Sequence, residues 1–155
     1  MGTHYRGSRE EVRALSAFIV LFRAADTVGG RVKIQIRSYG LTEPQFGILD
    51  TLFHLGPLEQ HLLARKRLVS GGNVTFIVDK LEAAGYVARG SAKSDRRCNL
   101  VRLTSAGRAL MKRVFPKQAR FITEVMGKLS QSEQEELARL CKKLGLGNKP
   151  RLTRE

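Results

Sequence analysis

The sequence has no tryptophan, only two cysteines and only 14 acidic residues among its 155 positions. The two cysteines, Cys98 and Cys141, are too few and too widely spaced for the disulfide framework of a small secreted domain. The longest apolar run, residues 17–22, is too short to cross a bilayer, and the first residues lack the apolar segment of an export signal. We therefore expect a cytoplasmic protein that does not span a membrane.

The residue patterns of common active sites are also missing. The sequence contains no Ser-His-Asp order, no glycine-rich phosphate loop and no carboxylates at metal-binding spacing. Its three histidines share no ligand spacing with a cysteine or a carboxylate pair. The sequence therefore predicts neither an enzyme nor a bound metal or cofactor.

Basic residues, by contrast, are abundant. Lys and Arg outnumber Asp and Glu by 28 to 14, which gives a formal charge of +14. This excess is larger than solubility requires and indicates a polyanionic partner, with nucleic acid ahead of a membrane surface. Because 42% of the residues are hydrophobic, the chain can build a core, and a disordered basic tail is excluded.

Hydrophobic spacing predicts a mainly α-helical chain with a small β-hairpin, an α+β fold. Thr42 is a suitable N-cap for the second helix, and Ser130 or Ser132 for the last. Pro116 either ends the helix that Thr104 caps or lies inside it. The expected helices cover residues 9–37, 42–56, 59–68 and 71–84, followed by two within 105–147.

Two short runs, residues 86–89 and 99–103, read as strands joined by the polar turn GSAKSDRR at residues 90–97. Two short helices with a tight break, followed by a hairpin, form the order of a winged helix-turn-helix. In that fold the second helix enters the DNA major groove and the hairpin is the wing. Eight basic residues and one acid lie between positions 86 and 113, so the charge is concentrated around the hairpin.

The predicted helix at residues 71–84 has an apolar face and an outward face. The residues expected on the apolar face are Val74, Ile77, Val78, Leu81 and Ala84. On the outward face Asn73 can contact adenine, Thr75 can offer a hydroxyl or a methyl group, and Lys80 can contact phosphate or guanine. Phe76 either packs on a thymine methyl group or belongs to the core. The candidate DNA-binding residues are Ser70, Gly72, Asn73, Thr75, Phe76, Lys80, Arg89, Lys93, Asp95, Arg96 and Arg97.

Three stretches carry a resemblance to a known family. SGGNVTFIVDKLEAAGYVAR, residues 70–89, resembles the recognition helix and first wing strand of the MarR family of winged-helix regulators. DRRCNLVRLTSAGRAL, residues 95–110, resembles the family's wing signature, and LTEPQFGILDTL, residues 41–52, resembles its second helix. The resemblance is strong over residues 41–110 and agrees in kind with the long flanking helices.

The resemblance implies a homodimeric transcriptional regulator, usually a repressor in this family, that binds a pseudo-palindromic site on double-stranded DNA. Arg97 would enter the minor groove with Asp95 holding it in position, while Arg96 would contact a phosphate. The implied parts are an N-terminal dimerisation helix at 1–40, a DNA-binding domain at 41–104 with the recognition helix at 71–84 and the wing at 86–103, C-terminal dimerisation helices at 105–147, and a tail at 148–155.

The resemblance also implies a small aromatic or phenolic effector, bound between the dimerisation helices and the winged domain. The candidate pocket residues are Tyr39, Phe46, Leu49, Phe53 and His54. An aromatic and leucine stripe at helical spacing also fits a plain core, so both interpretations remain open.

The cysteines leave two further alternatives. Cys98 adjoins Arg96 and Arg97, which would favour a reactive thiolate, but we prefer the interpretation that it is a small strand residue. Cys141 lies among leucines of the last helix and indicates packing at a dimer interface.

A sequence-independent architectural nucleic-acid-binding protein without ligand response is the alternative function. A pI of about 10.6 is enough to explain sequence-independent binding to nucleic acid, although the chain lacks the stacking aromatic residues that such proteins use.

Overall fold

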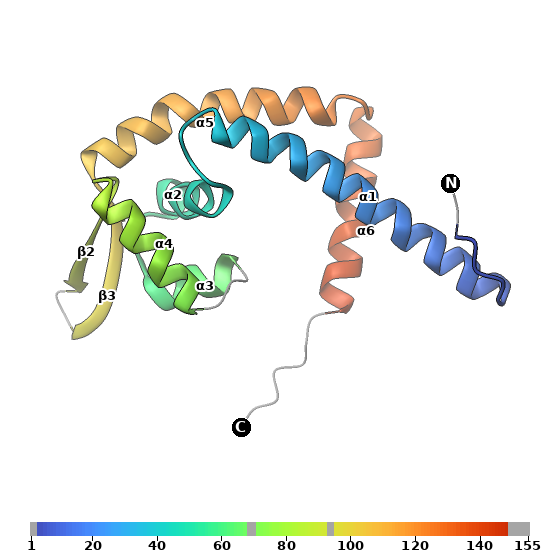
Figure 1. The fold of residues 1–155 in the computed structure, drawn as a ribbon, viewed down its shortest axis with the longest axis horizontal. Helices are drawn as coiled ribbons and strands as arrows, with labels where there is room; N and C mark the ends of the chain where they lie inside the picture. The colour runs from blue at the N-terminus through green and yellow to red at the C-terminus, as the bar shows by residue number, and fades with distance from the viewer. Residues whose placement is uncertain (1–2, 68–70, 93–94, 149–155) are drawn as a thin grey trace. The chain divides into compact units, whose positions relative to one another are not determined.

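The computed structural model describes residues 3–67, 71–92 and 95–148 and confirms a mainly helical α+β fold (Figure 1). The elements are α1 (Arg9–Arg37), α2 (Glu43–Leu55), β1 (Leu58–Glu59), α3 (Gln60–Arg67), α4 (Gly71–Ala83), β2 (Val87–Ala92), β3 (Asp95–Leu103), α5 (Ser105–Met126) and α6 (Gln131–Gly147). They form two compact units, Met1–Ala119 and Arg120–Glu155. Within the described ranges, no helix is both long and apolar enough to cross a membrane.

Helix α1 begins at a capping box and continues without interruption to Arg37. The Ser8 hydroxyl accepts a hydrogen bond from the backbone N–H of Glu11 at 3.2 Å, and the Glu11 carboxylate accepts one from the Ser8 N–H at 2.8 Å. Gly29 and Gly30 lie within the helix. Ile36 is its one buried residue, so the apolar residues predicted along α1 are mostly exposed within this chain.

Helix α2 begins and ends where the sequence predicts. Thr42 and Gln45 form a second capping box, with hydrogen bonds of 2.9 and 3.4 Å between each backbone N–H and the other side chain. Gly56 follows the helix with a φ of 78°, a left-handed value that glycine adopts without strain. Between these ends α2 contributes four large apolar side chains to the core, Phe46, Ile48, Leu49 and Leu52.

Helix α4 packs its predicted apolar face into the same core. Val74 and Val78 are fully buried, Leu81 is 1% exposed and Ile77 is 7% exposed. Ala84, which we expected on the same face, is exposed. The prediction fails there because α4 ends at Ala83, so the helical period no longer sets the direction of the next side chain.

The three strands form an antiparallel sheet in the order β1-β3-β2, and β1 was not predicted. Strand β1 has two residues, Leu58 and Glu59, which pair with Val101 and Leu100 of β3. A strand this short shows no alternation of its own, because its pairing depends on β3 more than 40 positions away. Figure 1 shows the β2–β3 hairpin beside α4.

The hairpin strands are longer than predicted. We expected strands at 86–89 and 99–103, but β2 continues to Ala92 and β3 begins at Asp95. Most of the predicted turn at 90–97 is therefore strand, with a register irregularity between Ser91 and Ala92. The polar composition of this segment concealed the pairing, because an antiparallel ladder is held by backbone hydrogen bonds and needs no apolar side chains.

A small group of backbone contacts joins α4, the hairpin and α5, and we call it the wing base. Gly85 ends α4 with a φ of 74°, while the N–H of Tyr86 donates to the Leu81 carbonyl at 2.9 Å. The Thr104 hydroxyl donates to the Gly85 carbonyl at 2.7 Å and accepts from the Gly107 N–H at 3.0 Å. The Thr104 N–H donates to the Tyr86 carbonyl at 3.1 Å. One threonine thus fixes three element ends together.

Helices α5 and α6 show which of the predicted alternatives holds at Pro116 and at the N-cap of the last helix. Helix α5 continues past Pro116, which is exposed, so water can bond the carbonyl that the proline ring leaves without its usual donor. Ser130, not Ser132, caps α6, where it forms a capping box with Glu133. In α6, Leu137, Leu140 and Leu144 form an exposed apolar row, and Leu146 is exposed on another side of the helix.

Gly107→Ala tests the wing base. Gly107 is buried, and an added methyl group would collide with the backbone carbonyl oxygen of Tyr86. Because backbone cannot rotate aside as a side-chain tip can, we expect the free energy of unfolding to fall by about 1–3 kcal/mol, with a lower Tm.

Gly145→Ala is the matched control, since no atom lies within 4 Å of the added methyl group and alanine favours a helix. Thermal unfolding followed by circular dichroism measures both variants. A Gly107→Ala protein that melts at the wild-type temperature would contradict the close approach.

Candidate nucleic-acid interface

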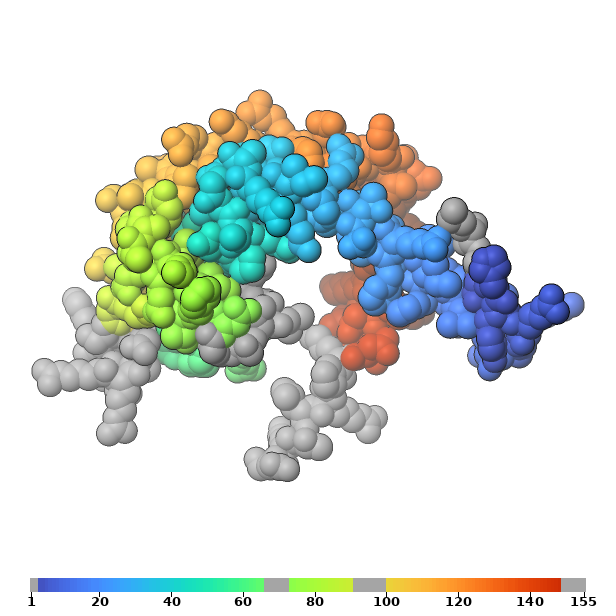
Figure 2. All heavy atoms as spheres, in the orientation of Figure 1, coloured from blue at the N-terminus to red at the C-terminus, as the bar shows by residue number. Residues whose placement is uncertain are grey.

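The outward face of α4 displays the residue types predicted for contact with bases. Asn73, Thr75, Phe76 and Lys80 are all exposed on this helix, which lies at the surface of the view in Figure 2. Residues two positions apart on a helix are separated by about 200°, so Phe76 lies opposite Val74 and the buried stripe. The exposed half of the helix thus carries Phe76 and Lys80 near its middle, with Asn73 and Thr75 at its two edges.

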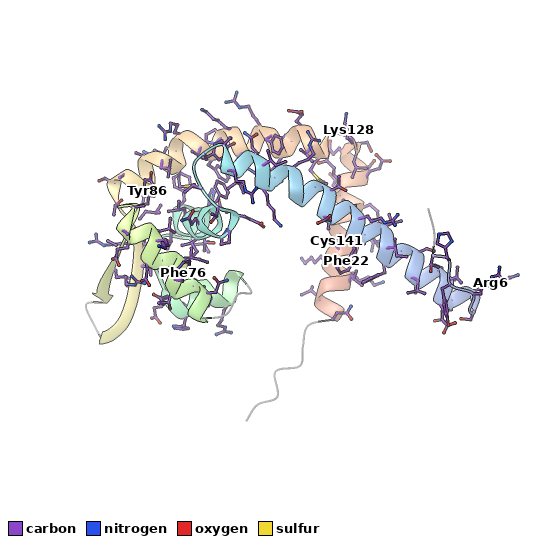
Figure 3. The ribbon with its side chains drawn as sticks, in the orientation of Figure 1. Arg6, Phe22, Phe76, Tyr86, Lys128 and Cys141 are labelled. Carbon is purple, nitrogen blue, oxygen red and sulfur yellow. The ribbon has the colours of Figure 1, made fainter. Side chains whose placement is uncertain are left out.

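Phe76 is 60% exposed, so the interpretation that it belongs to the core is wrong (Figure 3). The Nζ atom of Lys80, one helical turn later, lies 5.4 Å from the centre of its ring. This distance permits a cation–π attraction that favours one arrangement of the two side chains. Phe76 therefore presents a large apolar surface at the middle of an otherwise polar helix face.

Arg89 on β2 makes four hydrogen bonds through its guanidinium group. Its Nη1 donates to Glu82 Oε2 and its Nη2 to Asp79 Oδ1, each at 2.5 Å. The same Nη2 donates to the Thr75 carbonyl at 3.4 Å, and Nε donates to Gln60 Oε1 at 3.3 Å. Arg89, which the sequence predicts to contact DNA, is thus bonded to residues of α3 and α4.

Gln60 on α3 completes this group and was not predicted from the sequence. Its Nε2 donates to the Thr75 hydroxyl at 2.7 Å, while its Oε1 accepts from Arg89. A glutamine at the start of a short helix gives no sequence signal for such a role, since its partners lie 15 and 29 positions away. We call Gln60, Thr75, Asp79, Glu82 and Arg89 the Arg89 cluster.

The pKa shifts show that the cluster stabilises charged groups. The backbone N–H of Arg89, followed by its guanidinium group, lowers the pKa of the Glu82 carboxyl. Burial by itself would lower the pKa of Arg89, but its bonds to Asp79 and Glu82 outweigh that effect and raise it. Glu82 and Arg89 therefore remain an ion pair at neutral pH.

The hairpin backbone places the DRR sequence at its far end from the wing base. Val87 pairs with Leu103 next to the wing base, and Ala92 pairs with Asp95 at the other end of the ladder. Arg96 and Arg97 follow Asp95 in β3. Ser70 and Lys93 lie outside the described residues, and Gly72, Asp95, Arg96 and Arg97 are described by their backbone alone.

The five candidate pocket residues occupy different environments. Phe46 and Leu49 are 8% and 0% exposed and form part of the core. Tyr39 is partly buried, and its hydroxyl accepts a hydrogen bond from Gln35 at 2.9 Å. Phe53 and His54 instead meet at the end of α2.

Phe115, which the sequence did not single out, joins Phe53 and His54 in an aromatic group. The His54 ring centre lies 5.2 Å from that of Phe53 and 4.5 Å from that of Phe115. The His54 Nε2 atom is 3.3 Å from Asp50 Oδ1, one turn earlier. This group places an imidazole and a carboxylate beside two apolar rings.

Comparison with known proteins agrees with this geometry. The MarR family model matches residues 41–99. The chain is 34% identical over 139 residues to the HTH-type transcriptional regulator MhqR of Bacillus subtilis, a match that covers 88% of this chain and 94% of that protein.

Two solved structures are similar in fold and sequence. The MarR family protein Rv2887 of Mycobacterium tuberculosis, solved in complex with DNA, shares 31% identity at a TM-score of 0.65, over 82% of this chain and 95% of that one. BpsR of Bordetella bronchiseptica, whose DNA binding is regulated by 6-hydroxynicotinic acid, shares 25% identity at a TM-score of 0.74, over 83% and 98%. With its winged helix-turn-helix between long helices, the chain belongs to the MarR family.

Proposed function

We propose that this chain is a sequence-specific, double-stranded-DNA-binding transcriptional regulator, acting as a repressor that a small aromatic or phenolic ligand releases. The observation that carries the proposal is the exposed face of α4, with Asn73, Thr75, Phe76 and Lys80, beside a basic hairpin. The relative Rv2887 was solved with DNA, which supports the same use of this fold.

Each group on this face has a suitable partner in the DNA grooves. The Asn73 amide can bond adenine in two places, Thr75 offers a hydroxyl, and Lys80 suits guanine or phosphate. From the family resemblance we assign Arg97 to the minor groove, Asp95 to its support and Arg96 to a phosphate. Contacts to bases select the DNA sequence, and contacts to phosphates position the protein on the duplex. Together they give a defined register on DNA.

We propose that the protein binds as a homodimer. In α1, Phe18 and Phe22 are 54% and 59% exposed, with ring centres 4.3 Å apart. In α6 the leucine row and Cys141 are also exposed. Long helices that leave large apolar side chains in water favour burial against a second copy. Two-fold symmetry of the dimer then requires a pseudo-palindromic operator.

We propose that the effector binds at the aromatic group formed by Phe53, His54 and Phe115. The ring edges of Phe53 and Phe115 and the His54–Asp50 pair offer apolar and polar contacts to a small aromatic acid. BpsR, which responds to 6-hydroxynicotinic acid, supports a ligand of this size and chemistry.

Selection from a random duplex library tests the DNA-binding function. We expect a palindrome whose half-sites are about one helical turn apart, bound by two chains as measured by sedimentation. Affinity should fall steeply with salt, and Arg97→Ala should lose most of it. Competition at equal strength by unrelated duplex DNA would instead support a sequence-independent architectural protein.

Base analogues test the contact of Phe76. Replacing one thymine of each half-site by deoxyuridine removes two methyl groups from the palindrome, each worth about 0.8 kcal/mol when buried, so the dimer should lose about 1.6 kcal/mol, or about 15-fold in affinity. We expect this loss at one thymine position for the wild-type protein and for Phe76→Leu, but not for Phe76→Ala. Equal losses in all three proteins would exclude the contact.

A thermal-shift screen of phenolic acids tests the effector. A ligand at about 100 times its Kd stabilises the folded state by about 2.7 kcal/mol, which raises the Tm measurably. His54→Ala should remove the shift, whereas the control His61→Ala, at an exposed histidine paired with Glu59, should retain it. The effector site is wrong if active compounds shift His54→Ala as they shift the wild type.

A further inference from the structure

We infer that Arg89 is a positioning residue, which sets the angle between the recognition helix α4 and the wing, and is not a phosphate contact. This inference rests on the proposed DNA-binding function and refines it. Arg89, which the sequence predicts to contact DNA, would instead act through its bonds within the protein.

The donor inventory supports this role. A guanidinium group has five N–H donors, and the described partners of Arg89 engage four of them, one from Nε, one from Nη1 and two from Nη2. The backbone N–H of Arg89 also donates to Glu82 Oε1 at 2.9 Å. The side chain is only 23% exposed. One N–H at most is left for a phosphate, and the cost of breaking the ion pairs opposes any reorientation.

The elements that meet at Arg89 are those whose orientation DNA binding requires. Arg89 belongs to β2, Gln60 to α3, and Thr75, Asp79 and Glu82 to α4. The wing base already fixes the C-terminal end of α4 to the hairpin. A second attachment in the middle of α4 removes the remaining hinge, because two separated attachments fix a direction where one does not.

A loss of DNA affinity on removing Arg89 could also come from its charge, so the experiment must distinguish a charge effect from a positioning effect. The side chains of Asp79 and Glu82 are 57% and 40% exposed. Without Arg89 they would add two uncompensated negative charges near the DNA, which would weaken binding even if the geometry were unchanged. Loss of DNA affinity when Arg89 is replaced by a neutral residue is therefore not evidence for a positioning role.

Arg89→Lys separates the explanations because it keeps the charge and loses the planar fork that reaches several partners at once. Positioning predicts at least a tenfold loss of operator affinity, with an unchanged slope of log affinity against log salt. A phosphate contact or simple charge compensation predicts affinity near that of the wild type for Arg89→Lys. For Arg89→Gln, a phosphate contact further predicts a slope smaller by about one.

The double variant D79N/R89Q is the charge-matched test. It removes one negative and one positive charge, so the net charge of Asp79, Glu82 and Arg89 stays at −1. Positioning predicts that its affinity stays low, with the wild-type slope. Recovery of wild-type affinity, or a slope reduced by one, would overturn the inference.

Two measurements keep the outcome interpretable. Each variant must melt cooperatively and keep the wild-type circular dichroism spectrum, which a protein that fails to fold would lose. Lys80→Gln, at a proposed DNA contact, shows that a slope change is detectable. If the wild type itself prefers no operator, the proposed function fails; if it does and Arg89→Lys binds equally well, only the positioning inference fails.

Discussion

The wing base is the constraint on which the rest of the structure depends. Thr104 bonds to Gly85 and Gly107 through one hydroxyl, so the end of α4, the start of α5 and the open end of the hairpin are fixed at one point. Gly107 has no side chain, and this lets α5 begin against the backbone of Tyr86. These contacts give a structural reason for the threonine and the glycine of the wing signature, Thr104 and Gly107.

Helix α4, which begins this arrangement, has a buried face that packs into the core and an outward face that is exposed to solvent. Its buried valines and leucine attach it to α2 and the sheet, which gives a rigid support. Its outward face offers Asn73, Thr75 and Phe76 to solvent, while Asp79 and Glu82 are held by Arg89. The hairpin arginine thereby offsets part of the negative charge of this helix. Rigid support and exposed recognition groups are what specific binding needs.

The sequence predicted the parts whose signals are local. Helices α1, α2 and α4 have clear periodicity, and Thr42 and Gly85 mark the start of α2 and the end of α4. The family resemblance located the recognition helix and the wing. What the sequence missed depends on distant partners. Strand β1 pairs with β3, and Gln60 bonds to Thr75 and Arg89, which lie 15 and 29 positions away. The exposure of Phe76 required the actual rotation of the helix, since a phenylalanine fits both core and surface.

The central claim is that α4 and the wing act as one rigid unit that contacts adjacent grooves of a half-site. Hydroxyl-radical footprinting of the selected operator tests this claim most directly, because it maps protection along each strand at single-nucleotide resolution. Because the radical attacks the sugars, the account predicts two symmetric sets of sugar protections about one helical turn apart, each with protected backbone beside the major groove that α4 enters and protected sugars across the adjacent minor groove. Continuous protection without a dyad, or no protection across the minor groove, would contradict it.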